Sequence, residues 1–274
     1  MDLCFLSTID TFITDPLSHE FMRKALFMSS LVAAVCGFLS SYLTLKGWAL
    51  MGDAVSHSVM PGVVVAYALG LPFSLGAFIF GVGSVALIGF VKQKSRVKED
   101  TVIGLVFTGF FALGIVLVSK IKSNIDLHSI LFGSPLGISL SDVKQIVFIS
   151  LLVVLLLSVF RKDLMLYCFD PRHAKTVGIN VLFLHYLLLT CLSLAAVVGL
   201  QSVGIILVVA MLITPGATAY LLTDKFDIMT IISVFSAIIS SVIGIYFSFW
   251  FDLETGGSIV LIQTFIFLFA FLFA

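Results

Sequence analysis

Residues 181–222 read VLFLHYLLLTCLSLAAVVGLQSVGIILVVAMLITPGATAYLL, and none of them is Asp, Glu, Lys or Arg. An α-helix needs about 20 mostly apolar residues to cross the hydrocarbon core of a bilayer. The stretch is therefore long enough for two membrane spans, which we place at 181–200 and 203–222. Pro215 and Gly216 fall inside the second span, where we expect them to kink or break the helix.

The rest of the chain has a similar composition. Of its 274 residues, 60% are hydrophobic and 11% are charged, and the mean hydropathy is +1.21. Soluble domains carry about 25% charged residues, so this chain cannot cover a water-exposed surface and a water-soluble enzyme is excluded. Fifteen basic and fifteen acidic residues leave a net charge of zero, so there is no basic excess with which to bind nucleic acid.

Charged residues and turns divide the apolar sequence into nine segments. They lie near 21–45, 53–71, 73–91, 101–120, 143–160, 181–200, 203–222, 228–250 and 257–273. The second segment is short and contains Pro61 and Gly62, so we expect a broken or partial span there. The sequence thus predicts an all-α, polytopic membrane helical bundle with about 8–9 transmembrane segments. Residues 1–274 are expected to form one transmembrane domain.

The distribution of basic residues predicts the orientation of the chain in the membrane. If nine segments cross in alternation, ten basic residues share one side: Lys46, Lys92, Lys94, Arg96, Lys98, Arg161, Lys162, Arg172, Lys175 and Lys225. The other side has five: Arg23, Lys24, Lys120, Lys122 and Lys144. Cytoplasmic loops are enriched in Lys and Arg. We therefore expect a multi-pass protein of the plasma membrane with its N-terminus outside and its C-terminus in the cytoplasm.

Most acidic residues lie in loops or near helix ends, but Asp53 begins the second segment, within WALMGDAVSHSVMPG. At about 100° per residue, His57 lies one turn later on the same helix face. A carboxylate and an imidazole at this spacing can hold one divalent cation, and ionisable residues inside a bilayer indicate a functional site. Alternatively, Asp53 caps the helix and His57 is a hydrogen-bonded core residue. The Pro61–Gly62 break favours the metal site, because transporters place ion sites in discontinuous spans.

The donor atoms of this pair suit manganese, iron(II) or zinc, since they are oxygen and imidazole nitrogen without sulfur. Two side chains are too few for an octahedral ion, so a symmetric homodimer with the pair on its axis would supply four ligands. Water or the hydroxyls of Ser56 and Ser58 could complete the shell. We consider Met51, Ser56, Met60 and Pro61 as candidates for a pore or gate, with core packing as the alternative for the two methionines.

A polar segment at 162–179 lies between the fifth and sixth apolar segments, on the basic side. Asp170 and Pro171 are typical of a helix start, with Asp170 as the cap and Pro171 at the first helical position. Gly178 fits a C-terminal stop. The segment predicts a short cytoplasmic helix of about two turns, which is either an ordinary amphipathic loop helix or a docking helix for a cytoplasmic partner.

The sequence contains no GxxxxGK[ST], HExxH or GxSxG motif, so neither ATP binding of the phosphate-loop type nor hydrolase activity is supported. Within the spans, Asp53, His57 and His185 are the residues that could relay protons. So few ionisable residues favour a separate ATPase over an ion gradient as the source of energy for transport.

Four segments of the chain resemble one family of membrane proteins. MGDAVSHSVMPGVVVAYALG, at 51–70, resembles the signature segment of the permeases of ABC-type manganese, iron and zinc importers, the ABC-3 metal family. SLAAVVGLQSVGIILVVAMLITPGATAYLLT is similar to that family's later span pair, FDPRHAKTVGI to its coupling-helix segment, and FDLETGGSIVLIQTFIFLFAF to its C-terminal end. The segments follow the family's order, and the resemblance covers residues 20–273.

The resemblance implies a permease like those of type II ABC importers. Such a permease dimerises, binds two copies of a cytoplasmic ATP-binding subunit and receives metal from an extracytoplasmic metal-binding protein. The metal ligands implied by the family are Asp53 and His57. The residues implied to couple the permease to the ATPase are Asp170, Pro171, Ala174 and Gly178.

The expected function is ATP-driven import of a divalent transition metal through a homodimeric pathway by alternating access. The GDAxSHxxxPG form resembles manganese and iron permeases more than zinc permeases, so Mn(II) is the expected substrate, with Fe(II) and Zn(II) as alternatives. The chain itself is not expected to be an enzyme or to keep a permanent cofactor. Two other functions remain open: a cobalamin- or siderophore-type ABC permease, and a secondary metal carrier that needs no ATPase.

Overall fold

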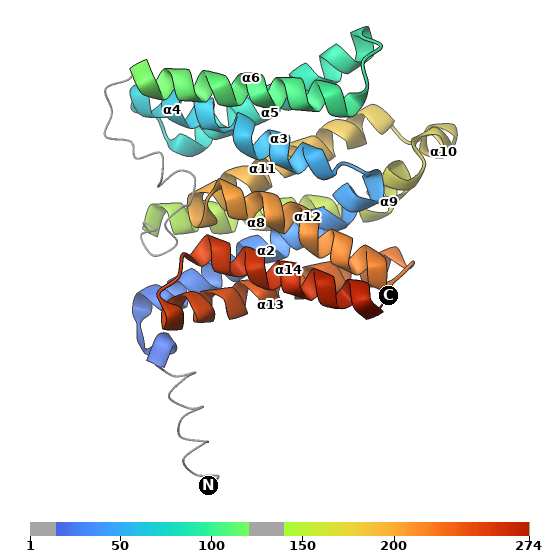
Figure 1. Ribbon diagram of the computed structural model, residues 1–274. Helices are drawn as coiled ribbons and strands as arrows, with labels where there is room; N and C mark the ends of the chain where they lie inside the picture. The colour runs from blue at the N-terminus through green and yellow to red at the C-terminus, as the bar shows by residue number, and fades with distance from the viewer. Residues whose placement is uncertain (1–14, 121–139, 274) are drawn as a thin grey trace.

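The computed structural model describes residues 15–120 and 140–273, and every regular element in these ranges is a helix. The helices are α2 (Glu20–Lys46), α3 (Ala49–Ser58), α4 (Met60–Ala68), α5 (Phe73–Lys94), α6 (Glu99–Lys120), α8 (Leu140–Val159), α9 (Arg161–Phe169), α10 (Pro171–Thr176), α11 (Val181–Val203), α12 (Ile205–Leu222), α13 (Phe226–Phe251) and α14 (Thr255–Phe273). They form a layered bundle with α4, α5 and α6 at one side and α13 and α14 at the other (Figure 1). The all-α prediction is confirmed.

Helix α2 runs through the bundle and approaches α13 closely. A Cβ atom added to Gly37 would lie 3.0 Å from the carbonyl oxygen of Ser233, and the Ser233 hydroxyl donates to the Gly37 carbonyl at 2.6 Å. About two turns nearer the N-terminus of α2, the hydroxyls of Ser29 and Ser241 lie 2.8 Å apart. Lipid gives no hydrophobic driving force between helices, so small residues that permit close packing and hydrogen bonding hold this pair together.

The sequence predicts that Pro215 and Gly216 kink or break the span; helix α12 contains Pro215 yet continues to Leu222, so it is not broken there. Ser40 of α2 lies against this turn. Its hydroxyl accepts a hydrogen bond from the Gly216 backbone N–H at 2.8 Å and donates to the Ile213 carbonyl at 3.2 Å. A neighbouring helix thus supplies partners for backbone groups next to the proline, which is how proline is tolerated within a membrane helix.

The number of spans is lower than the predicted 8–9. Among the described residues, six helices are long and apolar enough to cross a membrane, namely α2, α5, α6, α11, α13 and α14. A seventh is obtained if α8 and α9, which meet at 71°, count as one bent span. One of the other two apolar segments is divided at Val59 into α3 and α4, and the other contains a shorter apolar helix, described over Leu207–Leu222. Hydropathy detects apolar residues but not whether they form one continuous helix.

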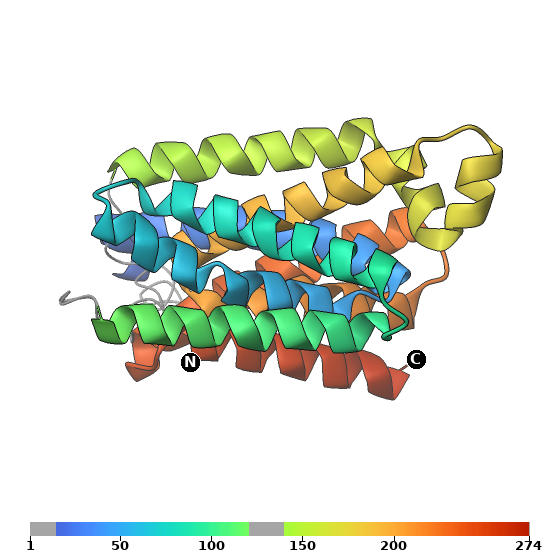
Figure 2. The ribbon, with the colours of Figure 1, turned by 90° about the horizontal axis from the view of Figure 1, so that it is seen from above.

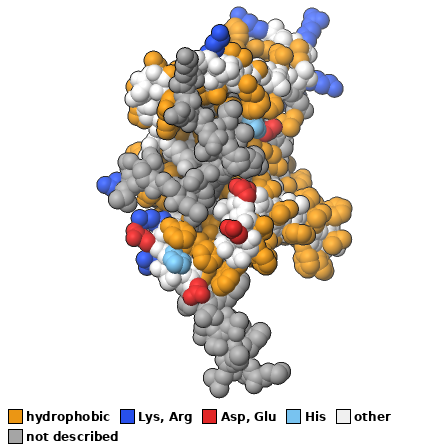
Figure 3. Space-filling model, turned by 60° about the vertical axis from the view of Figure 1, so that its left-hand side comes forward, with side chains coloured by type: hydrophobic (Ala, Val, Ile, Leu, Met, Phe, Trp, Pro, Cys, Tyr) orange, Lys and Arg blue, Asp and Glu red, His pale blue; other side chains and the backbone are white. Residues whose placement is uncertain are grey.

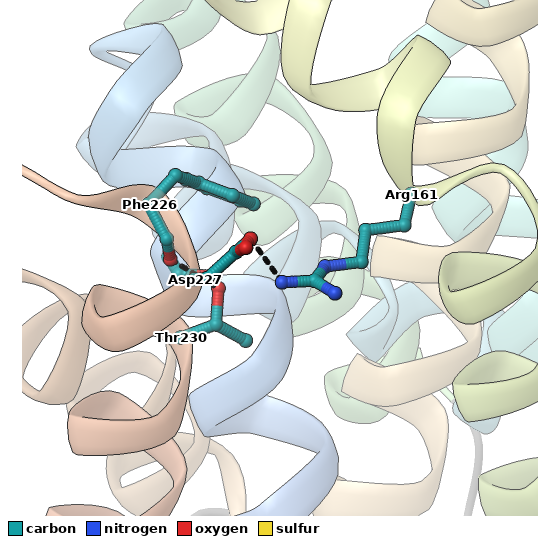
Figure 4. A network of polar contacts seen from close by, with 5 residues as sticks. Arg161, Phe226, Asp227 and Thr230 are labelled. Carbon is teal, nitrogen blue, oxygen red and sulfur yellow. Dashed lines mark hydrogen bonds and ion pairs between the residues drawn. The ribbon is translucent and has the colours of Figure 1, made fainter.

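The helices alternate in direction, which brings α9, α10 and the C-terminal end of α14 to the same end of the bundle (Figures 1 and 2). The basic end of α5 and Lys46 at the end of α2 lie there too. At this end, Arg161 of α9 forms an ion pair with Asp227 in the first turn of α13 (Figure 4). We call it the coupling end, because it carries the predicted coupling helix.

Much of the visible described surface is hydrophobic, and Lys and Arg side chains lie at its edges (Figure 3). Leu105 of α6, Phe148 of α8 and Phe235 of α13 are each more than 60% exposed. An exposed apolar surface of this extent fits contact with lipid.

Candidate functional site

The predicted metal pair lies on α3, a ten-residue helix packed between α6 and α12. The helix starts after Trp48, so Asp53 lies inside it and does not cap it. Gly52 faces α12, where an added Cβ would lie 3.3 Å from Leu212 Cβ. The helix ends before Pro61, which has no N–H to donate to the carbonyl of His57 one turn earlier.

Asp53 and His57 lie side by side on one face of α3. The Asp53 Oδ1 atom is 3.3 Å from His57 Nε2, and their side chains are 34% and 19% exposed. Within the described part of the chain, the buried Nδ1 atom of His57 has no hydrogen-bond partner. The two donor atoms therefore face one another at a partly open surface, and a small cation can approach both.

Two phenylalanines of α6 surround the imidazole of His57. The rings of Phe107 and Phe111 meet it edge to face, with centroids 5.0 and 5.3 Å away. Both residues lie in the middle third of the 22-residue helix α6, which places His57 near the middle of the bundle. Sequence reasoning missed these two residues. Their i, i+4 spacing carries no distinguishing signal in a chain with 27 phenylalanines.

The four pore or gate candidates lie in different surroundings. Met51 is buried and lines a cavity at the coupling end, while the Ser56 hydroxyl donates to the Gly52 carbonyl at 2.8 Å. Met60 and Pro61 are buried against α6, where a Cβ added to Gly114 would lie 3.2 Å from Met60 Cγ. Among the described residues, the Ser56 hydroxyl bonds to Gly52 and not to Asp53 or His57.

The described part of one chain does not by itself complete a metal site. Among the residues that the structure describes, no group of three or more His, Cys, Asp or Glu side chains is placed to hold a metal ion. Octahedral cations need more protein or water ligands than the two that α3 provides. Asp53 and His57 remain partly exposed, so the pair is accessible from outside the chain.

The predicted coupling segment forms the short helix α10, which has six residues. Asp170 caps it, accepting hydrogen bonds from the backbone N–H groups of Arg172 at 2.9 Å and His173 at 3.1 Å. Pro171 is its first residue, and Ala174, on the inner face of the same helix, is fully buried. Gly178 ends it with φ +89°, and the Gly178 and Ile179 N–H groups bond back to the carbonyls of Lys175 and Ala174. This pairing is a Schellman motif.

The cap also affects the ionisation of Asp170. The hydrogen bond from the His173 N–H, followed by that from Arg172, stabilises the carboxylate and lowers the pKa of Asp170 below its usual 3.8. Asp170 is therefore charged at neutral pH and stabilises the N-terminus of α10, where the helix dipole favours negative charge.

The chain matches proteins of one transport family. A family model described as ABC 3 transport family covers residues 18–274. The manganese transport system membrane protein MntB of Synechocystis sp. is 54% identical over 258 residues, 94% of this chain and 84% of that protein. The chelated iron transport system membrane protein YfeD of Yersinia pestis is 46% identical over 268 residues, 98% of this chain and 90% of that protein.

A solved structure shows the same arrangement of helices. PsaBC from Streptococcus pneumoniae, determined in complex with Fab, superposes with a TM-score of 0.88 at 40% identity, covering 96% of this chain and 95% of that one. Family model, sequence relatives and fold agree over almost the whole length. The chain therefore belongs to the ABC 3 transport family, as a membrane-spanning permease subunit and not an enzyme.

Proposed function

We propose that this chain is the permease subunit of an ATP-driven importer of a divalent transition metal, with Mn(II) as its preferred substrate. The observation that carries the proposal is the Asp53–His57 pair near the middle of the bundle, in which Asp53 Oδ1 lies 3.3 Å from His57 Nε2. Relatives 54% and 46% identical are named for manganese and chelated iron transport, which supports a transition metal of this kind. The whole chain serves as one transmembrane permease domain.

Charge favours a divalent ion. Two copies of the chain would bring two Asp53 carboxylates and two neutral His57 rings to one cation. Their charges sum to zero with a +2 ion, whereas a +1 or +3 ion leaves a net charge in a low-dielectric environment, which is costly. The oxygen and imidazole donors suit Mn(II), Fe(II) and Zn(II).

The partners follow from what one chain lacks. A second, identical copy would supply the other half of the metal site on the dimer axis. Two cytoplasmic ATP-binding subunits would each contact one α10. Asp170 caps this helix and its Ala174 side chain is buried, which makes α10 a rigid docking element. An extracytoplasmic metal-binding protein would deliver the ion at the opposite end. ATP-driven movement of α10 would then open the pathway alternately to each side.

The test is uptake of radioactive Mn(II) into cells that lack other manganese importers. Asp53→Asn and His57→Gln should each reduce uptake at least about tenfold, since each removes a ligand from both halves of the site. Asp15→Asn and His19→Gln, both before α2 and outside the coupling segment, are the matched controls and should transport normally. Wild-type uptake by both α3 variants, at equal expression, would rule out the site.

Competition during the same assay distinguishes the substrates. Excess Fe(II) or Zn(II) should reduce Mn(II) uptake less than an equal excess of unlabelled Mn(II). Cobalamin or a ferric chelate should not compete, because a chelate already occupies the ligand positions that the pair would fill. Uptake that continues when the ATPase subunit is inactivated would instead indicate a secondary carrier.

A further inference from the structure

A cavity of about 650 Å³ opens at the coupling end of the bundle, between α5 and α11. Its floor includes Trp48 and Met51 at the start of α3, and its outer wall includes Pro171 and Lys175 of α10. It is separate from the metal pair. Met51 and Asp53 are two residues apart on one helix and therefore point to nearly opposite sides.

The cavity is positively charged. Three lysines line it, Lys46, Lys92 and Lys175, and none of its described lining residues is Asp or Glu. Lys46 is held in place by Tyr167, with its Nζ atom 4.0 Å from the ring centroid and 3.3 Å from the backbone carbonyl oxygen. A cavity lined by several ammonium groups attracts an anion.

The deeper walls are apolar. On α5, Ile88 and Val85 lie on the same face as Lys92, one and two turns farther from the coupling end respectively. On α11, Leu189 lies one turn deeper than His185. The cavity therefore changes from cationic at the end of the bundle to apolar toward the middle of the membrane.

The cavity opens beside surfaces that face lipid. Phe90 of α5 and Leu182 of α11 are 56% and 59% exposed next to it. Trp48 and Tyr167 contribute an aromatic wall, and the Tyr167 hydroxyl is 2.9 Å from His185 Nδ1. Aromatic residues with a polar group are typical of the membrane–water interface.

We propose that this cavity binds the headgroup of an anionic phospholipid from the cytoplasmic leaflet. In such a complex the lipid phosphate would contact the three lysines of the cationic part of the cavity. The acyl chains would lie along Val85, Ile88 and Leu189 in its apolar part. A free phosphate would use only the lysines, and an acidic protein segment would leave the apolar wall uncovered. Basic pockets between membrane helices at the cytoplasmic face bind phosphate-bearing lipid headgroups in this way.

The chain contains a built-in fluorescent reporter, because it has only two tryptophans. In the Trp250→Phe variant of the full-length protein, Trp48 in the cavity wall is the remaining one. We expect brominated phosphatidylglycerol vesicles to quench it at a mole fraction at least about tenfold lower than brominated phosphatidylcholine vesicles. The Trp48→Phe variant, in which Trp250 reports, should show no such preference. Equal quenching of Trp48 by the two lipids would overturn the proposal.

Charge removal then locates the site. Lys92 and Lys175 are both exposed, so Lys92→Gln with Lys175→Gln should fold normally. The double variant should weaken the phosphatidylglycerol preference by roughly 25-fold, about fivefold for each lysine. Lys94→Gln is the matched control, since Lys94 also lies at the end of α5 but contacts Phe90, with Nζ 4.6 Å from the ring centroid. An equal loss in the control would overturn the proposal.

Two further arms separate the lipid from other anions. Inorganic phosphate at millimolar concentration should leave the preference for phosphatidylglycerol unchanged. If phosphate abolished that preference, the cavity would be assigned to free phosphate. The single Lys92→Gln variant, whose substitution lies on α5 and outside α10, should still copurify with its ATPase subunit. Loss of the ATPase from this variant with an unchanged lipid preference would assign Lys92 to the partner instead. These measurements require no transport, so they can fail or succeed independently of the proposed import of metal.

Discussion

Gly62 of α4 and Gly76 of α5 show how a single residue can set the distance between two helices. A Cβ atom added to Gly76 would lie 2.1 Å from the Gly62 carbonyl oxygen and 2.7 Å from Ala66 Cβ. Backbone cannot move aside as a flexible side chain can, so the two helices would have to separate. Glycine is required here for close packing and not for an unusual backbone conformation.

We therefore predict that Gly76→Ala destabilises the protein by about 2 kcal/mol, as overpacking of a tight interface does. Gly83→Ala on the same helix is the matched control, because an added Cβ there would meet nothing within 4 Å. Thermal unfolding of the purified protein in detergent measures both. An unchanged melting temperature in Gly76→Ala would mean that α4 and α5 are not in contact in the folded protein.

At the scale of an element, α10 is specified almost entirely by its own sequence. Asp170 caps it, Pro171 starts it and Gly178 ends it. Of the six residues described in α10, Ala174 is the one that is buried, and the helix packs through it. An element with so little buried surface depends on its caps.

We predict that the cap is sensitive to acid. The pKa of Asp170 is lowered in the folded protein, so the carboxylate stabilises α10 above pH 3.8 and loses that effect as the pH falls through the folded-state pKa. Hydrogen exchange, corrected for intrinsic rates, should show several-fold loss of protection in residues 172–176 between pH 7 and pH 3. Asp170→Ala should lose protection at all pH values.

Asp170→Asn provides the control for this experiment. Its side-chain oxygen can still accept from the Arg172 and His173 N–H groups, but it does not titrate. Protection in this variant should be independent of pH. If Asp170→Asn and the wild-type protein lose protection together, the titrating group lies elsewhere.

At the scale of the whole molecule, alternating helices separate the chain into two ends with different charge. The coupling end contains α9, α10, Lys46 and the basic end of α5. Helix α13 connects the two ends. It begins at Phe226 after the exposed Asp224 and ends at Phe251, before the exposed Leu253.

We predict that the coupling end faces the cytoplasm, since basic loops remain inside. In a Cys4→Ser background, Leu253→Cys should react with a membrane-impermeant maleimide in right-side-out vesicles. Asp224→Cys should react only after permeabilisation. Cys36, Cys168 and Cys191 are buried and give a low background. The reverse labelling pattern would place α10 outside, where no cytoplasmic ATPase could reach it.

The sequence by itself determined the features that depend on neighbouring residues. Apolar runs located the helices, the i, i+4 spacing placed Asp53 and His57 on one face, and Asp170, Pro171 and Gly178 marked the limits of α10. Each of these depends on backbone geometry over one or two helical turns, which the order of residues largely sets.

The tertiary structure alone decided what surrounds those features. Phe107 and Phe111 contact His57 from another helix. The Ser40 hydroxyl accepts a hydrogen bond from the Gly216 N–H, next to Pro215 and 176 residues away along the chain. The lysines of the coupling-end cavity come from three separate helices. Such contacts depend on which helices pack together and in what rotation, and an apolar sequence leaves that open because lipid and helix interior select for the same residues.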